Sequence, residues 1–389
     1  GAIRMLGILH GMYEANHEIT LLSFYNGDIQ LQSTPLSTYC EKIVTLPLPP
    51  RTKIDRLRTL FLSIQPDIAH RFYDDKFART LSELLQQTQF DLIQFEAIEA
   101  VCYLPIAKKL QPDAIISFDT FNAEYALQRN MFEIDIANIR RWPLAAYSYI
   151  QMRRITRFER EMCRIADIVF AVSSEDAELL ADFREDRKVY IVPSGIFVKD
   201  YEQSDVLEVD LKQPAMVFTG TMNYRPNVDA ILRFAESALP DVIEQRPSAQ
   251  LYVVGNRPHP RLESLRSHTN IHITGWVDST QPYLNAATLY VAPLRMGSGT
   301  RLKLLEAMAC GCAIVATSTA AAGLLDDIKR AMIIVDTAQE MAEAIVSLLD
   351  DVQRRQALGV QARELVRKHY DWSMLTPNLL AAYKENGLG

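Results

Sequence analysis

Short apolar runs alternate along the first half of the chain with segments in which apolar residues recur every three or four positions. The runs predict buried strands, and the three-to-four spacing predicts amphipathic helices. We expect strands at residues 17–24, 42–46, 91–95, 114–118, 167–172 and 189–192. We expect helices at residues 3–15, 53–62, 74–86, 99–109, 124–130 and 145–165. This alternation is typical of an α/β domain whose mostly parallel sheet is covered on both faces.

The pattern breaks at residues 193–215, where a Pro-Ser-Gly turn precedes an acidic, poorly periodic stretch typical of an interdomain linker. Beyond it we expect strands at residues 216–220, 250–255, 270–275, 288–293, 313–317 and 331–335. Helices are expected at residues 227–238, 280–286, 301–310, 338–349, 352–369 and 371–386. We therefore predict two α/β domains, residues 1–195 and 196–370, with the helical segment 371–389 packing back on the first. A cleft between two such domains is the natural place for a ligand.

The chain opens directly with the helical pattern, although an α/β domain is expected to begin with a strand. Two interpretations are open. The first strand is absent by design, or the sequence is truncated and Gly1 is the tail of a loop that followed a lost strand. We favour truncation.

One segment of the second half has the pattern of a phosphate site. The apolar run 288–293 leads to Gly297, Ser298, Gly299 and Thr300, and strong helix formers then continue to Gly311. A glycine-rich loop before a helix directs backbone N–H groups and the positive end of the helix dipole at one point, which suits phosphate. Such a loop is also common in βα units that bind nothing.

Charged residues just after this loop favour a phosphate site over a loop that binds nothing. Arg301 and Lys303 oppose the helix dipole in the first turn, so local stability does not explain them and an anion would. One turn later, Glu306 has a carboxylate suited to accepting bonds from two ribose hydroxyls. Phosphate donors followed by a sugar acceptor predict a nucleotide diphosphate.

Composition excludes several other classes of protein. The formal net charge of −7 argues against general nucleic-acid binding. No apolar stretch approaches the ~20 residues of a membrane span, and residues 1–12 lack the pattern of a signal peptide. The five scattered cysteines indicate a reducing compartment, so we expect a cytoplasmic protein. Cys310 and Cys312 have no zinc-spaced partners and are interpreted as small buried residues, and no metal is expected.

At this point the sequence resembles a known family. Residues 216–324 are similar to the C-terminal, nucleotide-binding domain of family-4 GT-B glycosyltransferases, through residues 218–227, 251–255, 273–277, 293–311 and 322–324. The first half resembles the same family at residues 17–22, 119–125, 158–163 and 171–176. The resemblance implies two Rossmann-like domains facing across a cleft. It also implies a retaining transfer of sugar from a nucleotide-diphosphate donor to an acceptor hydroxyl of a surface polysaccharide or glycolipid, without a metal or other cofactor.

The resemblance assigns residues to the donor. Glu306 matches the second glutamate of the family's E-x7-E motif and is expected to bind the ribose, while Ser298 replaces the first in a GSGTRLK variant. Gly220 and Thr221 lie where a loop faces the phosphates. The family's usual Arg and Lys pair is not obvious there, and Arg225 with Lys303 is expected to take that role.

The base and the acceptor have further candidates. Gly275, Trp276 and Val277 would present backbone groups to the base, although Trp276 is more often a core residue. Asn227 is expected to cap a helix. Glu96, after the strand 91–95, would orient the acceptor hydroxyl, and an ordinary solvated carboxylate is the equal alternative.

One segment is rich in basic residues, which suggests contact with a membrane. Its arginines are at positions 140, 141, 153, 154, 157, 160 and 164. A basic amphipathic helix can dock on the anionic inner face of the cell membrane, and a glycan or lipid-linked acceptor fits that place. The commoner alternative is a solvated helix face paired with Glu159 and Glu161.

Two other functions fit the same architecture. One is a nucleotide-sugar epimerase, disfavoured because Ser298 and Phe121 replace the glutamate and histidine expected in its cleft. The other is a non-catalytic relative that binds nucleotide sugars.

Overall fold

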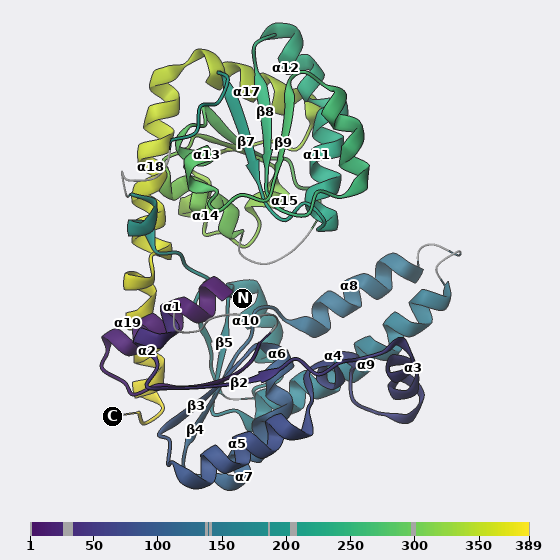
Figure 1. Ribbon diagram of the computed structural model, residues 1–389, viewed down its shortest axis with the longest axis vertical. Helices are drawn as coiled ribbons and strands as arrows, with labels where there is room; N and C mark the ends of the chain where they lie inside the picture. The colour runs from purple at the N-terminus through teal and green to yellow at the C-terminus, as the bar shows by residue number, and fades with distance from the viewer. Residues whose placement is uncertain are drawn as a thin grey trace. The chain divides into compact units, whose positions relative to one another are not determined.

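The computed structural model describes residues 2–25, 34–136, 139, 142–185, 187–202, 208–296 and 301–388 (Figure 1). The chain divides into two compact units. Unit 1 comprises Gly1–Pro193 and Thr376–Gly389, and unit 2 comprises Ser194–Leu375. The first division lies two residues before the domain boundary expected at 195, and the second lies inside the last helix.

Unit 1 is an α/β domain with two parallel sheets among its described residues. Its elements are α1 (Ala2–Glu14), β1 (Thr20–Tyr25), α2 (Leu36–Tyr39), β2 (Lys42–Pro47), α3 (Lys53–Leu62), α4 (Asp67–Phe72), α5 (Asp75–Gln87), β3 (Leu92–Glu96), α6 (Ala97–Ala100), η2 (Val101–Tyr103), α7 (Leu104–Leu110), β4 (Ile115–Asp119), α8 (Glu124–Ile136), α9 (Trp142–Ile165), β5 (Ile168–Ala171), α10 (Ser174–Ala181) and β6 (Val189–Ile191). One sheet pairs β1 with β2, and the other has the order β3-β4-β5-β6.

The last helix, α19 (Trp372–Glu385), completes unit 1 with its residues from Thr376 onward. Tyr383 is buried edge-on against Phe170 of β5, with ring centroids 5.5 Å apart. Gly11 of α1 packs so closely on this helix that a Cβ there would lie 2.4 Å from Thr376 Oγ1. The helical segment at the far end of the chain therefore contributes core residues to the domain that the chain forms first.

Helices α8 and α9 pack along one another as a long hairpin, which Figure 1 shows extending beyond β3 and β4. Glu124 starts α8, as expected, but the helix continues past residue 130. The expected helix 99–109 is instead divided into α6, η2 and α7. Pro105 lies in the first turn of α7, where its missing N–H is tolerated, and it cannot continue an earlier helix.

Unit 2 is a single doubly wound sheet with helices between its strands. Its elements are η4 (Val198–Tyr201), β7 (Ala215–Thr219), α11 (Arg225–Ser237), α12 (Leu239–Gln245), β8 (Gln250–Val254), η5 (Pro260–Ser267), β9 (Ile271–Gly275), α13 (Gln281–Asn285), β10 (Leu289–Ala292), α14 (Leu302–Ala309), β11 (Ile314–Ala316), α15 (Ser318–Ala321), α16 (Asp326–Lys329), β12 (Ile333–Ile334), α17 (Ala338–Asp350) and α18 (Val352–Tyr370). The strand order is β12-β11-β10-β7-β8-β9, and every pairing is parallel.

This strand order indicates at which edge of the unit 2 sheet a ligand is expected. The chain starts at β7, moves outward to β9, and returns on the other side with β10, so the direction of winding reverses between β7 and β10. Ligands of doubly wound sheets bind at the carboxyl ends of the strands at such a switch point. The residues after Thr219 and after Ala292 are therefore the first place to look for a site. The linker expected before this domain contains the short helix η4.

Candidate functional site

Two glycines shape the switch-point edge of unit 2. Gly220 follows β7 with φ of 153°, and Gly255 follows β8 with φ of 148°. A Cβ on Gly255 would lie 1.8 Å from the Gly220 carbonyl oxygen, so no other residue fits there. Because neither glycine has a side chain, the backbones at the two strand ends lie in contact. The space next to Gly220 is then filled by a side chain of α14.

That side chain is Lys303. Its Nζ donates to Asn227 Oδ1 at 2.7 Å and lies 4.3 Å from the ring centroid of Phe218. A Cβ on Gly220 would come within 2.8 Å of Nζ, so the glycine makes room for the ammonium. Burial, with a further contribution from Arg301, lowers the pKa of Lys303 to about 7.

Asn227 does not cap a helix, and that expectation was wrong. Helix α11 begins at Arg225 after Tyr224, which places Asn227 inside the first turn, where it is buried. Its amide nitrogen donates to the Thr221 carbonyl at 2.9 Å, and this bond fixes which way the amide points. The oxygen is then directed at Lys303, so Asn227 positions the ammonium.

Arg301 is a second cation at this edge, directly before α14. Its side chain is only 8% exposed, and its Nε and Nη2 atoms have neither solvent nor a hydrogen-bond partner among the described residues. Burial lowers its pKa. A buried cation without a counter-ion costs free energy, and an anionic ligand would remove that cost.

Glu306 lies one turn after Lys303 and is already partnered. Its carboxylate accepts a hydrogen bond from the Tyr201 hydroxyl. Burial raises the pKa of Glu306, while this bond and Lys303 lower it. Tyr201 was missed from the sequence because it lies in η4, within the expected linker, over 100 positions before its partner.

The remaining donor-side candidates differ in exposure. Thr221 and Arg225 are exposed. Trp276 is 69% exposed, so its interpretation as a core residue was wrong, whereas Val277 packs against the core. Gly275 has φ of 78° and open space where a Cβ would point.

Three further candidates of the glycine-rich loop lie outside the described residues: Ser298, Gly299 and Thr300.

In unit 1, two carboxyl groups lie side by side at the ends of β3 and β4, where Glu96 and Asp119 are register partners. Buried Arg4 of α1 donates to both Asp119 oxygens, at 2.7 and 2.6 Å, and to the Val192 carbonyl at 2.6 Å. Asp119 is thus fully paired. Tyr383 approaches the same cluster through Gln94.

Glu96 is the carboxyl of this cluster that forms no ion pair among the described residues. Its Oε1 accepts from Gln94 Nε2 at 2.5 Å, while Oε2 is buried without a hydrogen-bond partner among the described residues. Burial first, and then the neighbouring Asp119, raise the pKa of Glu96 well above its ordinary value. The alternative of a solvated loop carboxylate was therefore wrong. Ala97, the next residue, has φ of 67°, which is strained for a residue with a Cβ.

The arginines of the basic run are not paired with Glu159, as the alternative of a solvated helix face expected. Glu159 is buried and accepts the backbone N–H groups of Glu124 and Tyr125, at 3.0 and 2.9 Å, so it does not pair with the arginines of α9. Its pKa is raised to about 8, chiefly by burial. Arg140 and Arg141 lie outside the described residues.

Two family models match the chain. The model described as "Glycosyltransferase Family 4" matches residues 3–199, half of the chain, and the one described as "Glycosyl transferases group 1" matches residues 213–351. The chain belongs to glycosyltransferase family 4. The resemblance inferred from the sequence is thereby confirmed for the family.

Curated relatives of this family 4 chain are distant. It is 28% identical over 200 residues to phosphatidyl-myo-inositol mannosyltransferase of Mycolicibacterium smegmatis, covering 50% of this chain and 51% of that protein. It is 22% identical over 345 residues to spore coat protein SA of Bacillus subtilis, covering 80% and 83%. The chain spans about half the length of the curated relatives it matches first.

Solved structures confirm the GT-B fold for this family 4 chain. Sucrose-phosphate synthase of Thermosynechococcus elongatus aligns with a TM-score of 0.71 at 16% identity, covering 98% of this chain and 92% of that one. Anabaena Alr3699/HepE in complex with UDP aligns with a TM-score of 0.64 at 13% identity, covering 99% and 96%.

Two further properties of the family 4 chain concern metals and membranes. Within the described ranges, His, Cys, Asp and Glu side chains form no group of three or more able to hold a metal. Cys310 and Cys312 are buried, as expected, and neither forms a disulfide with a described residue. None of the described helices combines the length and apolar character needed to cross a bilayer.

Proposed function

We propose that this chain is a retaining glycosyltransferase that moves a sugar from a nucleotide-diphosphate donor to an acceptor hydroxyl. One observation carries the proposal. At the switch point of unit 2, buried Arg301 and half-buried Lys303 have no hydrogen-bonded carboxylate among the described residues, and they lie beside a carboxylate suited to a ribose. An anion with an attached sugar matches that arrangement in both charge and order along α14.

Each residue has a role in this proposal. Lys303 and Arg301 bind the diphosphate, whose leaving oxygen gains charge as the glycosidic bond breaks, so that cations held in place stabilise the transition state. Asn227 and Gly220 position Lys303. Glu306 binds the ribose hydroxyls, with Tyr201 fixing its carboxylate. No metal or other cofactor is required, because these cations occupy the place where a metal would neutralise the phosphates.

On the acceptor side, burial and then Asp119 raise the pKa of Glu96 well above its ordinary value, which favours the neutral carboxyl. A neutral carboxyl donates one hydrogen bond and accepts another. We propose that it orients the acceptor hydroxyl as a donor, rather than removing its proton as a base. The curated relative that is named as a phosphatidyl-myo-inositol mannosyltransferase supports a glycolipid acceptor. A cytoplasmic place of action, with contact to the inner face of the membrane, remains a prediction.

A thermal-shift screen tests the donor site. The full chain is melted with UDP, GDP, ADP and their sugars, with a chelator present throughout. Ligand at about 100 times its Kd adds about 2.7 kcal/mol to the native state, which raises Tm visibly. We expect a shift with one base, reduced in Glu306→Ala and unchanged in Glu343→Ala, an exposed glutamate of α17.

The reaction is tested next with the selected nucleotide sugar. Transfer of the sugar to a lipid or glycan acceptor with retained anomeric configuration is the expected result. Conversion of the sugar without an acceptor would instead indicate an epimerase, and binding without any transfer would indicate a non-catalytic relative.

A further inference from the structure

Unit 1 contains a cavity of about 710 Å³ between the segment after α3, the first half of α8 and the middle of α9. This volume lies in the range of small-molecule sites, roughly 300–1,000 Å³. Nine residues line the cavity, and none of them is acidic. Five of them are arginines: Arg129, Arg153, Arg154, Arg157 and Arg160.

Most of this positive charge is not neutralised within the described part of the chain. Arg129 lies 3.9 Å from Glu133, the one carboxylate there that forms an ion pair with a lining arginine. Arg160 stacks over the Phe183 ring at 4.9 Å, which leaves its charge in place. Arg153 and Arg157 are exposed, one turn apart on α9. Guanidinium groups bind phosphate oxygens with paired hydrogen bonds, so such a cluster suits a phosphate or diphosphate.

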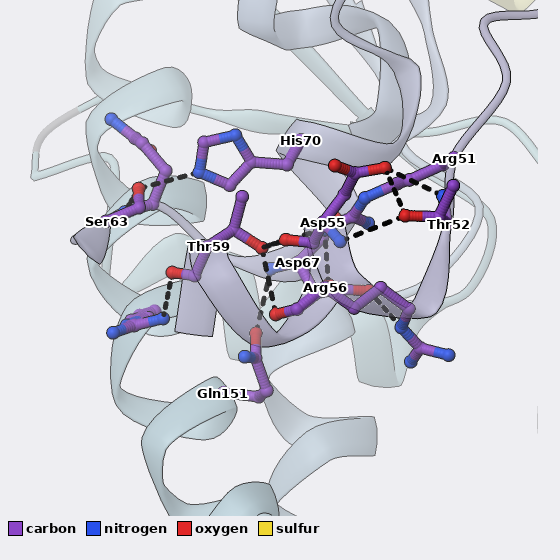
Figure 2. A network of polar contacts seen from close by, with 11 residues as sticks. Arg51, Thr52, Asp55, Arg56, Thr59, Ser63, Asp67, His70 and Gln151 are labelled. Carbon is purple, nitrogen blue, oxygen red and sulfur yellow. Dashed lines mark hydrogen bonds and ion pairs between the residues drawn. The ribbon is translucent and has the colours of Figure 1, made fainter. Parts of the chain in front are cut away.

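Polar contacts hold the wall of the cavity in place (Figure 2). Arg154 donates to the Leu60 carbonyl at the end of α3, at 2.7 Å. Gln151 of α9 accepts the Asp67 N–H at 2.8 Å, and Arg51 donates to Asp67 Oδ1 at 2.8 Å. Figure 2 shows Gln151 pointing from its helix toward Asp67. Because these contacts tie α3 and α4 to α9, the cavity is a built feature of unit 1.

Large apolar side chains are exposed beside the arginines. Phe61 and Leu62 end α3 with 76% of each side chain exposed, and Ile64, which lines the cavity, is 70% exposed. Ile54 and Leu57 extend this apolar surface along α3. Exposed apolar groups next to clustered cations match an amphiphile, with the anionic headgroup on the cations and the hydrocarbon on the apolar side chains.

We propose that this cavity binds the phosphate or diphosphate headgroup of a lipid, whose hydrocarbon chain lies against Phe61, Leu62 and Ile64. The cavity adjoins the acceptor-side edge of unit 1, because Tyr125, another lining residue, follows the last residue of β4 by six positions. The inference rests on the proposed function for the role of this lipid as the acceptor or its carrier, and its binding is measured independently.

Vesicle binding tests the site in the full chain. Vesicles of phosphatidylcholine contain about one-fifth phosphatidic acid, a phosphate monoester, or the same share of phosphatidylserine. At about 1 kcal/mol for each arginine near an anionic surface, Arg153→Gln with Arg157→Gln should weaken binding to phosphatidic acid roughly 25-fold. The matched control, Arg79→Gln with Arg233→Gln, removes the same charge from exposed positions on α5 and α11 and should stay within about twofold.

Two further arms separate the sources of the signal. Wild type should prefer phosphatidic acid, and excess inorganic pyrophosphate should compete. Phe61→Ser with Leu62→Ser should lose vesicle binding and keep pyrophosphate binding. Equal binding of both lipids, or an equal loss in the control variant, means diffuse attraction and overturns the proposal. Pyrophosphate binding without vesicle binding by wild type overturns the lipid assignment.

The same samples distinguish this inference from the proposed function. The variant at Arg153 and Arg157 should keep the nucleotide-dependent rise in Tm, which also shows that it is folded. Wild type that binds vesicles of phosphatidic acid but no nucleotide would overturn the proposed donor site and leave the lipid site standing. Nucleotide binding without vesicle binding would overturn the lipid site alone.

Discussion

The charged clusters at the strand ends of the two units differ in which charged group lacks a partner among the described residues. In unit 1 the cation, Arg4, is paired with Asp119, and Oε2 of the acid Glu96 accepts no hydrogen bond from the residues that the structure describes. In unit 2 the acid, Glu306, is hydrogen-bonded to Tyr201, and Nε and Nη2 of the cation Arg301 have no partner within the described part of the chain. In unit 1, burial and the neighbouring Asp119 raise the pKa of Glu96 and so favour its neutral form. In unit 2, Arg301 keeps two nitrogen atoms without a partner among the described residues. The strand ends of unit 1 therefore suit a neutral hydroxyl, and those of unit 2 suit the proposed diphosphate.

Removing the paired cation of unit 1 should have the largest effect. Arg4→Met leaves Asp119 buried and unpaired, which typically costs about 3–5 kcal/mol. Urea unfolding of the full chain measures this loss. The double variant Arg4→Met with Asp119→Leu removes both charges and should recover most of it. No loss in the single variant would contradict the view that the pair is structural.

Removing a cation of unit 2 should affect binding more than folding. A hydrogen bond to a charged group contributes about 1.5–3 kcal/mol, so Lys303→Met should raise the Kd of the diphosphate roughly 10- to 100-fold. Stability should hold or rise, because a desolvated ammonium is gone. Calorimetric titration and thermal melting check both parts, and unchanged affinity would exclude Lys303 from the site.

The pH dependence sharpens the same assignment. The folded pKa of Lys303 is about 7, below its ordinary value of 10.5, so the folded state binds this proton less well than the unfolded state. Between these values stability should increase with pH. A bound diphosphate favours the charged form, so its affinity should decrease above about pH 7, by at most about tenfold per pH unit. Titration in buffers of different ionisation enthalpy should show proton uptake in wild type and none in Lys303→Met.

Trp276 offers a smaller test on the donor side. Because its side chain is 69% exposed, Trp276→Ala should change the free energy of unfolding by less than about 0.5 kcal/mol. If the indole stacks on the base, nucleotide affinity should fall by about 1–3 kcal/mol, as for other base–aromatic contacts. Retained affinity would leave only the backbone of this segment as a base contact.

The smallest effect is expected at Glu96. Because burial favours the neutral carboxyl, Glu96→Gln keeps the size of that form and its ability to donate a hydrogen bond, and stability should stay within about 1 kcal/mol of wild type. Transfer should survive, because an amide also orients a hydroxyl. Urea unfolding and the rate of transfer at neutral pH check this, and loss of transfer in a stable variant would indicate that Glu96 acts as a base.

Much of the fold could be predicted because local pattern determines it. Each strand expected from an apolar run has a counterpart in the structure, since a strand buried on both faces must be apolar throughout. Short helices such as α4, α10 and α12 were missed, because few periodic positions mark them. The cations of α14 were found because their charge opposes the helix dipole, a conflict visible in the sequence itself.

The partners of these residues could not be predicted in the same way. Arg4 and Asp119 are 115 positions apart, and nothing near either residue indicates the other. Trp276 was misjudged because its size favours burial, and only the position of Gly275 at the end of β9 places it outside the core. Pairing between residues far apart in the sequence arises only on folding, so the local pattern of residues does not predict it.

The return of the last helix to unit 1 has a consequence for synthesis on the ribosome. Domains usually fold in the order in which they are made, but here the sequence of unit 2 is complete at Leu375 while unit 1 still lacks the end of α19, including Tyr383, which packs on Phe170 of β5. Unit 2 can therefore finish folding first, although most of unit 1 has left the ribosome before it. Until residues 376–388 emerge, the nascent chain displays the unfilled side of β5, which is a natural binding place for a chaperone.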